Sequence, residues 1–466
     1  MQNMSLQQLA TTVNGHLVGE NVCFDSVSTD TRSIQQDDLF VALQGDHFDG
    51  NYFVSEASEN GAIAALVSAD VVADIPYVKV DDTLIALTQL AKQQRESVDI
   101  PLVAITGSNG KTSVKELLAS ILNVSKQVLA TEGNFNNQIG VPLTLLNLTQ
   151  SHEVAVIEMG ASQAGDIAHL CDIAKPTVAI LNNVGSAHLE GFGSLQGVAS
   201  AKGEIISGLS ATGTAILNQQ EPWLDQWLEL LEKRKLMLFG WSDEADVWAD
   251  ADSVQMSLVK GQFKTTFVLN YQQQHIDIQL NLMGKHNVLN ALAAASAALS
   301  LGEPLSRIKE GLGRVTAVKG RMQALQGTGG SIVINDCYNA NPKSFEAALA
   351  CLTHIKQPFW VVLGDFAELG VNSTQIHRQM AEQIVKSNVQ QFYAVGEQMQ
   401  YAVEAFNAQS DSPDRQAVHF ASQEELVEHL QKTLSSGVLV LVKGSRSQGL
   451  EKIVEKITQL EGSACC

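Results

Sequence analysis

Positive charge is scarce in this chain. Its 466 residues include 30 Lys and Arg against 50 Asp and Glu, which gives a formal net charge of −20. This acidic balance opposes non-specific binding to nucleic acid or to an anionic membrane, because both carry negative charge. We therefore expect no nucleic-acid partner. An anionic substrate remains compatible, since local cationic side chains, backbone N–H groups and metal ions override the global field at a site.

Cysteine is also sparse and unpatterned. The six cysteines include no C-x-x-C pair, which argues against a disulfide framework or a zinc site and favours a reducing compartment. We expect the terminal pair, Cys465 and Cys466, to be an exposed tail without function. The N-terminus has neither a basic start nor an apolar core, and no apolar run approaches bilayer length. These absences predict a cytoplasmic protein without membrane insertion.

From residue 100 onward, short apolar runs alternate with stretches of helical spacing. This alternation predicts parallel sheets in doubly wound α/β folds. The runs that we interpret as buried strands are 102–107, 153–160, 177–185, 331–336, 359–365, 392–396 and 438–444. Between 245 and 282 the pattern changes to the polar–apolar alternation of antiparallel strands, and a helix resumes after Gly284.

The length favours about three domains. We predict an N-terminal α/β domain over 1–81 and a central domain over 82–318, which opens with a helix at 83–96. The central domain should combine a parallel sheet with an antiparallel extension. A third, Rossmann-like α/β domain follows over 319–466.

Polar or Gly-rich clusters follow nearly every predicted strand. In parallel α/β sheets, ligands bind at the carboxyl ends of the strands. The clusters predict an active site shared between two α/β domains. They are Thr106-Gly107, Glu158, Asn182-Asn183, Asp336, Asp365 and Lys443.

The segment ITGSNGKTSVKELL reads as a strand, a Gly-rich turn and a helix. It is a variant phosphate loop, T-G-x-x-G-K-T, because Ile105 stands where the strict motif has its first Gly. Backbone N–H groups and the helix N-terminus would face phosphate oxygens, Lys111 would neutralise β- and γ-phosphate charge, and the Thr112 hydroxyl would hold Mg²⁺. The predicted loop residues are Thr106, Gly107, Ser108, Asn109, Gly110, Lys111, Thr112 and Ser113.

From the residues alone, two further positions have two interpretations each, and a third has one. Glu158 ends a buried strand near the loop, where it is either a Mg²⁺ ligand or a solvated loop acid. His188 lies on a Gly-rich segment and is either a ligand or a structural side chain. Lys202 follows on a helical stretch, where a lysine is ordinarily a surface residue.

An ordered set of motifs resembles the Mur ligase family of peptidoglycan synthesis. The motifs are ITGSNGKTSVKELL, NFNNQIGVPLTLL, IEMGASQAGDI, NNVGSAHLEGFGS, AKGEI, GKHNVLNALAA, GRMQ and NDCYNANPKS. The resemblance covers essentially the whole chain. YNANP is similar to the sequence of the D-alanyl-D-alanine-adding members, and the D-N-P-R motif of members that add the preceding residue is absent.

The resemblance implies roles for the site residues. Lys111 and Thr112 would grip ATP and a first Mg²⁺, with Glu158 as a ligand of that ion and Asn137 beside the γ-phosphate. His188 and Lys202 would serve a second Mg²⁺, with Lys202 carrying CO₂ as a carbamate. The remaining implied ATP contacts are Asn287 and Asn290 at adenine, Arg321 at the γ-phosphate, Asp336 and Tyr338 at the ribose, and Asn339 and Asn341 around the nucleotide.

The segment STDTRSIQQDDLFVALQGDHFDGNYF resembles the family's UDP-sugar-binding domain. Its matching positions are Ser28, Arg32, Gly45 and Asp49. The chain departs from the family pattern at Thr31, where Ser is usual, at Asn51, where His is usual, and at Phe366, where Met is usual. It also departs at Gly449-Leu450-Glu451, which bears on an acceptor site around Lys443, Ser445 and Arg446.

The activity implied by the resemblance is ATP-dependent joining of D-alanyl-D-alanine to UDP-N-acetylmuramoyl-tripeptide through an acyl phosphate, by a monomer. Alternatives are a sister ligase for another amino acid, a folate polyglutamate synthase, and an ATP-driven switch protein, which the phosphate loop alone permits. A dinucleotide dehydrogenase is disfavoured, because no G-x-G-x-x-G opens any strand–helix unit.

Overall fold

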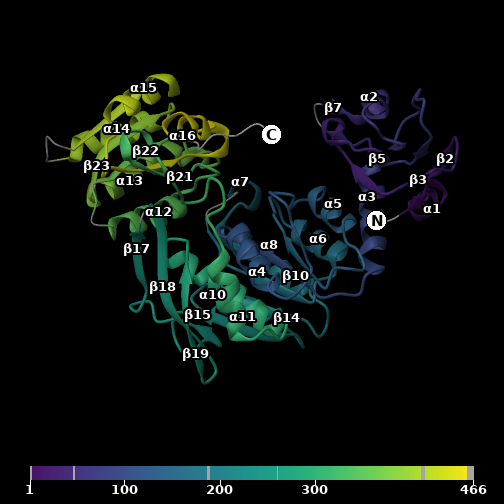
Figure 1. Cartoon of the computed structure of the whole chain (residues 1–466), viewed down its shortest axis with the longest axis horizontal. Coiled ribbons are helices and arrows are strands. Elements are labelled where there is room, and N and C mark those ends of the chain that lie inside the picture. Colours follow the sequence, from purple (N-terminus) through teal and green to yellow (C-terminus); the bar gives the residue numbers. More distant parts are fainter. Residues whose placement is uncertain are drawn as a thin grey trace.

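The computed structural model describes residues 3–45, 48–185, 189–259, 261–355, 357, 359–410 and 415–458. Among these residues, three main sheets of five, ten and six strands follow one another along the chain. Figure 1 shows them as an N-terminal part in purple, a central part in blue and teal, and a C-terminal part in green and yellow. The N- and C-terminal parts lie on opposite sides above the central part.

The N-terminal sheet has the order β2-β9-β8-β5-β4 and is parallel except where β2 meets β9. Its five strands are β2 (His16–Val18), β4 (Ser26–Ser28), β5 (Asp38–Val41), β8 (Ala64–Val67) and β9 (Tyr77–Lys79). Two short pairs flank it, β1 (Met4–Ser5) with β3 (Cys23–Phe24) and β6 (Gln44–Gly45) with β7 (Phe48–Asp49). The helices are α1 (Leu6–Thr12) and α2 (Val54–Glu59).

Helix α3 (Thr83–Glu96) joins the N-terminal part to the central part. Asp82 caps it by accepting hydrogen bonds from the backbone N–H groups of Leu84 and Ile85. Its buried face packs against α1 on one side and against α5 and α6 on the other. One continuous apolar core therefore runs from Leu6 through α3 to the central sheet.

The central sheet has the order β11-β12-β10-β13-β14-β15-β16-β18-β17, and β19 pairs with β18. It is parallel from β11 to β16 and antiparallel beyond, as the sequence predicts. The strands are β10 (Leu102–Thr106), β11 (Val128–Ala130), β12 (Val154–Glu158), β13 (Val178–Leu181), β14 (Thr214–Asn218), β15 (Lys235–Gly240), β16 (Val247–Trp248), β17 (Gln255–Val259), β18 (Gln262–Tyr271) and β19 (Gln274–Leu280).

Helices cover both faces of this sheet. Helix α4 begins directly after the phosphate loop, and its residues Val114, Leu117, Leu118 and Ile121, at helical spacing, are fully buried. Alanine-rich α10 packs against it and is buried nearly all round. The helices of the central part are α4 (Lys111–Leu122), α5 (Gly140–Leu146), α6 (Asp166–Ala174), α7 (Leu189–Phe192), α8 (Leu195–Ser207), α9 (Leu224–Leu228), α10 (Lys285–Ser300) and α11 (Leu305–Arg314).

The C-terminal sheet has the order β20-β21-β25-β22-β23-β24, and only β20 is antiparallel. Its strands are β20 (Gln323–Gln326), β21 (Ile332–Asp336), β22 (Phe359–Leu363), β23 (Val389–Val395), β24 (Gln416–Phe420) and β25 (Leu439–Lys443). Its helices are α12 (Pro342–Thr353), α13 (Ser373–Lys386), α14 (Met399–Gln409), α15 (Gln423–Thr433) and α16 (Glu451–Ile457). A three-part α/β architecture with parallel-containing sheets is thereby confirmed.

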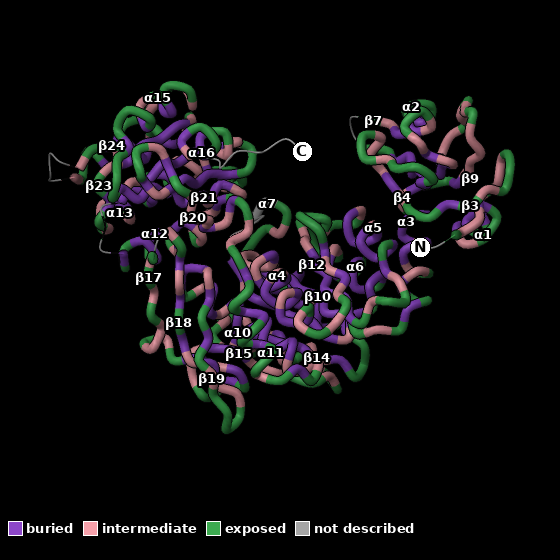
Figure 2. The backbone as a smooth tube through the Cα atoms, in the orientation of Figure 1, coloured by how far each residue is buried: buried purple, intermediate pink, exposed green. Residues whose placement is uncertain are grey.

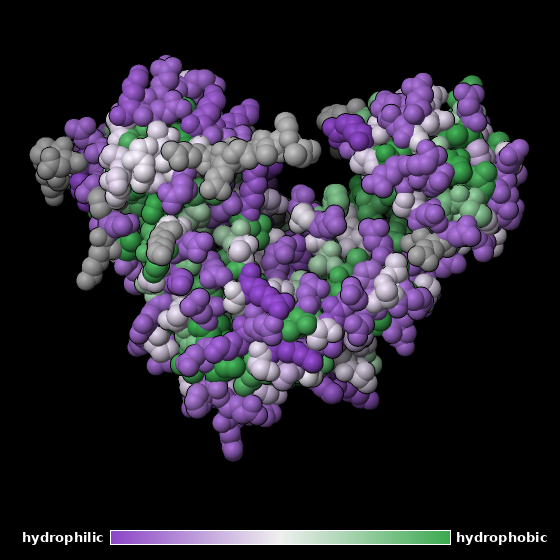
Figure 3. Space-filling model, in the orientation of Figure 1, coloured by the Kyte–Doolittle hydropathy of each residue, from purple (hydrophilic) through white to green (hydrophobic). Residues whose placement is uncertain are grey.

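Burial follows the sheets. The parallel strands at the middle of the central and C-terminal sheets are buried, whereas the antiparallel strands β17–β19 and edge strand β24 also carry exposed residues (Figure 2). The face drawn in Figure 3 is mostly hydrophilic and is hollowed between the N- and C-terminal parts. Within the described ranges, no helix has the length and apolarity needed to cross a membrane.

Candidate active site

A cavity of about 480 Å³ lies where the central and C-terminal parts meet. The phosphate loop, helix α10 and the start of α12 line it. Most of the predicted ATP and metal residues are at its wall. Those that line it are Ser108, Asn109, Gly110, Lys111, Thr112, Ser113, Glu158, Asn287, Asn290, Arg321, Asp336, Tyr338, Asn339 and Asn341.

The phosphate loop depends on Gly110. Its φ of 80° is a left-handed conformation that favours glycine. A Cβ there would lie 2.5 Å from Asn290 Oδ1 and 2.7 Å from Asn182 Nδ2. Helix α4 begins at the next residue without a side-chain cap. The backbone N–H groups of its first turn are therefore available to a phosphate.

Polar residues at the end of strand β13 hold the loop in place. The Asn109 backbone N–H donates to Asn183 Oδ1 at 2.9 Å, and the Asn109 carbonyl accepts from Asn182 Nδ2 at 3.0 Å. Ser108 Oγ exchanges hydrogen bonds with the backbone of Gly185. The predicted loop residue Thr106 is fully buried and donates to the Met159 carbonyl instead of lining the cavity.

A chain of polar contacts lies where the phosphate loop passes into α4, and it joins Thr112, Glu158 and Arg321. The Thr112 hydroxyl donates to Glu158 Oε2 at 2.9 Å and accepts from the Arg321 guanidinium at 3.0 Å. Lys111 Nζ donates to the Gly107 carbonyl at 2.8 Å. Burial lowers the pKa of Lys111, and Glu158 opposes that shift. Two hard oxygen donors and the Arg321 guanidinium are thus within one hydrogen-bonded group, and the charge of Glu158 acts on the nearby Lys111 ammonium.

The two neighbouring asparagines of NFNNQIG differ in what they contact. Asn136 Nδ2 donates to Glu158 Oε1 at 2.8 Å and lines the cavity. Asn137, the residue predicted beside the γ-phosphate, is exposed, and its Oδ1 accepts the backbone N–H groups of Ile139 and Gly140 at the start of α5. Because the two asparagines are adjacent in one motif, the sequence alone could not show which side chain lines the cavity and which one binds the start of α5.

Lys202 lies on helix α8 and is 3% exposed. Burial, together with the charge of Lys111, lowers the pKa of its amine to about 7. The expectation of an ordinary surface lysine from position alone is therefore wrong, because α8 turns this side chain inward. His188, the other predicted ligand of the second Mg²⁺, lies outside the described residues.

Buried amides connect helix α10 to the loop. Asn182 Nδ2 donates to Asn290 Oδ1 at 2.8 Å, and Asn290 Nδ2 donates to Asn287 Oδ1 at 3.1 Å. Asn287 in turn donates to the Met283 carbonyl. This line of amides fixes α10 against the phosphate loop.

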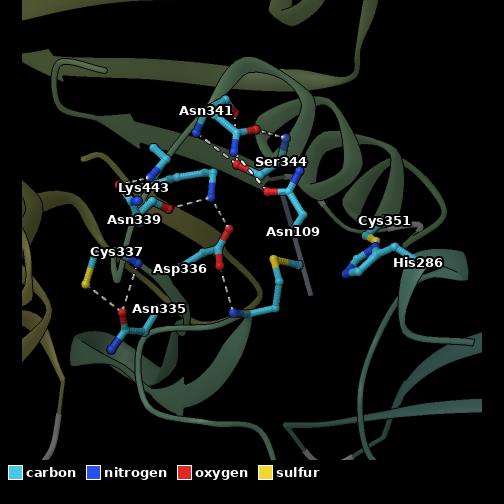
Figure 4. A network of polar contacts seen from close by, with 12 residues as sticks. Asn109, His286, Asn335, Asp336, Cys337, Asn339, Asn341, Ser344, Cys351 and Lys443 are labelled. Carbon is cyan, nitrogen blue, oxygen red and sulfur yellow. Dashed lines mark hydrogen bonds and ion pairs between the residues drawn. The ribbon is translucent and has the colours of Figure 1, made fainter. Parts of the chain in front are cut away.

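The C-terminal wall is built around Asp336, at the end of β21 (Figure 4). Asp336 Oδ2 pairs with the buried Lys443 ammonium at 2.7 Å, and its Oδ1 accepts the Met322 N–H at 3.0 Å. The Arg321 guanidinium lies over the Tyr338 ring, 4.2 Å from its centroid. The C-terminal part thereby presents Arg321 to the loop of the central part.

The cavity also contains titratable residues that the sequence did not single out. Burial raises the pKa of Glu221 and lowers the pKa of His286. Lys343, from α12, lies near Glu221 and donates to the Val184 carbonyl at 3.1 Å. Glu221 follows β14, a strand that the apolar pattern did not predict, so no sequence signal placed it here.

Comparison with known families identifies the chain. Three family models match in order: "Mur ligase family, catalytic domain" at residues 24–95, "Mur ligase middle domain" at 105–298 and "Mur ligase, glutamate ligase domain" at 320–446. UDP-N-acetylmuramoyl-tripeptide–D-alanyl-D-alanine ligase of Escherichia coli (strain K12) is 39% identical over 98% of this chain and 99% of its own length. The chain belongs to the Mur ligase family.

Solved structures agree with this Mur ligase assignment. The crystal structure of MurF from Acinetobacter baumannii has a TM-score of 0.87 at 33% identity, covering 98% of this chain and 99% of the other. The structure of MurF ligase from Thermotoga maritima in complex with ADP has a TM-score of 0.80 at 28% identity, covering 92% and 96%. The three-domain Mur ligase fold and ATP use are thereby supported.

The four predicted UDP contacts of this Mur ligase lie in its N-terminal part, outside the residues that line the cavity. Ser28 is buried and donates to the Asp30 carbonyl. Arg32 is exposed and pairs with Asp30 at 2.6 Å, which lowers the Asp30 pKa to about 2. Asp49 accepts from Asn51, and Gly45 lies in β6, close to the Phe48 ring.

Proposed function

We propose that this chain joins D-alanyl-D-alanine to UDP-N-acetylmuramoyl-tripeptide, with conversion of ATP to ADP and phosphate. The observation that carries the proposal is 39% identity over 98% of the chain to a ligase of that name. The cavity between the central and C-terminal parts supports it. There the phosphate loop, Arg321 and the Asp336–Lys443 pair surround one space.

ATP would lie along this cavity with its phosphates on the phosphate loop, of which residues 108–113 line the cavity. Lys111 and Arg321 are the cations within reach of the β- and γ-phosphates. Asn287 and Asn290 would contact adenine from α10. Asp336, Tyr338, Asn339 and Asn341 would hold the ribose side from the C-terminal part.

The hydrogen-bonded group of Thr112, Glu158 and Arg321 is suited to bind Mg²⁺. Among the described residues, no group of three or more His, Cys, Asp and Glu side chains is arranged as a metal site. Mg²⁺ on a nucleotide, however, uses one or two protein oxygens together with phosphates and waters. Thr112 Oγ1 and Glu158 Oε2, 2.9 Å apart, are suitable hard donors. When bound, Mg²⁺ would neutralise phosphate charge during transfer.

We propose that Lys202 carries CO₂ as a carbamate and, with His188, holds a second Mg²⁺. Only the neutral amine reacts with CO₂, and the Lys202 pKa of about 7 leaves a large neutral fraction near pH 7. Carbamylation replaces a buried cation with an oxygen ligand. A lysine that would be costly to bury as an ammonium thereby becomes a suitable metal ligand.

The UDP-muramoyl end of the substrate would bind to the N-terminal part, at Ser28, Arg32, Gly45 and Asp49. Arg32 is exposed and can pair with a phosphate. In this proposal the N-terminal domain spans residues 1–81, the central domain 82–318 and the C-terminal domain 319–466. The ligase would act as a monomer in the cytoplasm, where ATP is available.

The proposed reaction runs through an acyl phosphate. The terminal carboxylate oxygen of the tripeptide attacks the γ-phosphorus, and ADP leaves. The dipeptide amine then attacks the acyl carbon and loses a proton, and inorganic phosphate leaves. Lys111 and Arg321 would stabilise the charge that develops on the transferring phosphoryl group. Enclosure between the two parts would keep water from the acyl phosphate.

The test is phosphate release from ATP and Mg²⁺ with UDP-N-acetylmuramoyl-tripeptide, with and without D-alanyl-D-alanine. Release that needs both, with a UDP-linked pentapeptide found by mass spectrometry, is the expected result. Release with single amino acids but not with the dipeptide would point to a sister ligase, and release without either substrate to a switch protein. ¹⁸O placed in the substrate carboxylate should appear in the released phosphate, and its absence would exclude the acyl phosphate.

A further inference from the structure

The start of helix α12 contacts the phosphate loop from the opposite side of the cavity. Asn341 Nδ2 donates to Asn109 Oδ1 at 2.9 Å (Figure 4). Asn341 belongs to the C-terminal part and Asn109 to the central part. This hydrogen bond therefore connects the two parts at the loop itself.

The Asn341 amide is held in one orientation. Its Oδ1 accepts the Ser344 N–H at 2.8 Å and caps α12, and the Asn341 N–H donates to Ser344 Oγ at 3.1 Å. Pro342 at the first helical position restricts the backbone further. With the oxygen engaged in the cap, the amide NH₂ must face outward, toward Asn109.

Asn109 is held equally firmly from its own side. Its backbone N–H and carbonyl are bound by the side chains of Asn183 and Asn182, as described above. A second bond to the same carbonyl comes from Asn183 Nδ2 at 3.0 Å. The Asn109 backbone thus holds the side-chain oxygen within reach of the Asn341 donor, so that little of the loop must be ordered when the bond forms.

Lys343 makes a second contact from the same turn. Its Nζ donates to the Val184 carbonyl at 3.1 Å, and the Val184 N–H donates to Glu221 Oε2 at 3.1 Å. The side chain passes beside Gly185, where a Cβ would come within 3.6 Å of Lys343 Cδ. Both contacts of this turn therefore meet the loops at the carboxyl ends of central strands β10 and β13.

We propose that Asn341 and Lys343 are positioning residues that set the register of the C-terminal part on the phosphate loop, an inference that rests on the proposed ligase function. Arg321, Asp336 and Tyr338 line the cavity from the C-terminal part and would reach the nucleotide from there. A small shift of that part would move all three together away from the phosphates. Displacements of about 1 Å can lower a rate substantially even when they arise away from the reacting atoms.

Asn341→Ser separates the interdomain contact from the helix cap. Serine caps as well as asparagine but is too short to reach Asn109, whereas Asn341→Ala loses both interactions. We expect the two variants to lose kcat equally, by up to about tenfold, which is the range of one neutral hydrogen bond. Only Asn341→Ala should also lower the melting temperature.

The double variant Asn109→Ala with Asn341→Ser tests the bond itself. If the two side chains act through one contact, the second substitution adds no further loss of kcat. Lys343→Met should lower kcat in the same way, and Lys386→Met, at an exposed lysine of the C-terminal part, serves as the matched control. Unchanged kcat in Asn341→Ser, or losses that multiply in the double variant, would overturn the proposal.

Small-angle X-ray scattering separates this proposal from the proposed function. In saturating ADP, Asn341→Ser should have a larger radius of gyration than wild type, and this measurement needs no peptide substrate. Equal radii of gyration for Asn341→Ser and wild type would contradict the proposal that Asn341 positions the C-terminal part. A wild-type protein that releases no phosphate with both peptide substrates would instead refute the ligase function.

Discussion

Replacing Lys202 with methionine should stabilise the protein at neutral pH while abolishing the proposed ligation. Lys202 is buried, and its pKa is lowered from 10.5 to about 7. In the unfolded chain the amine holds its proton up to about pH 10.5. Below pH 7 the folded protein therefore contains a desolvated ammonium, at a cost of roughly 5 kcal/mol.

The pH dependence has a definite sign. Between about pH 7 and 10.5 the unfolded state binds more protons than the folded state, so wild-type stability rises with pH. Methionine has no charge and a similar length, and it adapts well to buried space. The advantage of Lys202→Met should therefore be largest below pH 7 and should vanish toward pH 10.5.

Calorimetric melting of both proteins in bicarbonate-free buffer, at about pH 6 and about pH 9.5, measures this difference. Adding ¹³C-bicarbonate should reduce the difference in stability between wild type and Lys202→Met. It should also give wild type a carbamate resonance in the ¹³C NMR spectrum that Lys202→Met lacks. A variant that is less stable than wild type at pH 6, or an equal difference at both pH values, would refute the reasoning.

Three further changes test other contacts. Thr112→Val removes the hydroxyl that donates to Glu158 and should weaken Mg²⁺-dependent ADP binding about tenfold without unfolding the chain, as measured by Mg²⁺ titration. Asp336→Asn leaves the buried Lys443 ammonium without its ion pair and should cost about 3–5 kcal/mol, measurable by urea unfolding. Arg95→Met removes the side chain that donates to the carbonyls of Ala174, Val98 and Ile100 and should cost about 2–4 kcal/mol in the same assay. An unchanged midpoint in either urea experiment, or unaltered Mg²⁺ dependence in the first, would contradict the corresponding argument.

Most strands predicted as apolar runs are buried on both faces, whereas the half-exposed antiparallel strands within 245–282 were predicted from their polar–apolar alternation. Runs such as 102–107 and 438–444 became β10 and β25, whose residues are all buried. The N-terminal strands were not predicted, because all of them have only two to four residues, and several are half exposed although β5 and β8 are buried. Edge strand β24 alternates buried and exposed positions irregularly, and so it too gave no clear pattern.

The site could be predicted where its residues form a local motif. The phosphate loop was recognised because its glycines, Lys111 and Thr112 are contiguous in the sequence. Lys343 and Glu221 could not be assigned, since their proximity depends on how the C-terminal part meets the central sheet. The roles of all these site residues, including the phosphate loop, Asn137, Lys202 and the four UDP contacts, stay predictions.

The continuous apolar core that passes through α3 couples the unfolding of the N-terminal part to that of the central part. Leu6 and Leu9 share that core with Leu87 of α3 and with Ala104 of the central sheet, and it contains many buried residues of both parts. The C-terminal core takes in only two buried residues of the central part, Phe263 and Met283, and the C-terminal contacts with the phosphate loop are polar. Heating should therefore melt the first two parts as one cooperative unit and the C-terminal part as another. Limited proteolysis should likewise yield a stable fragment that ends near residue 318, with the first two parts still together.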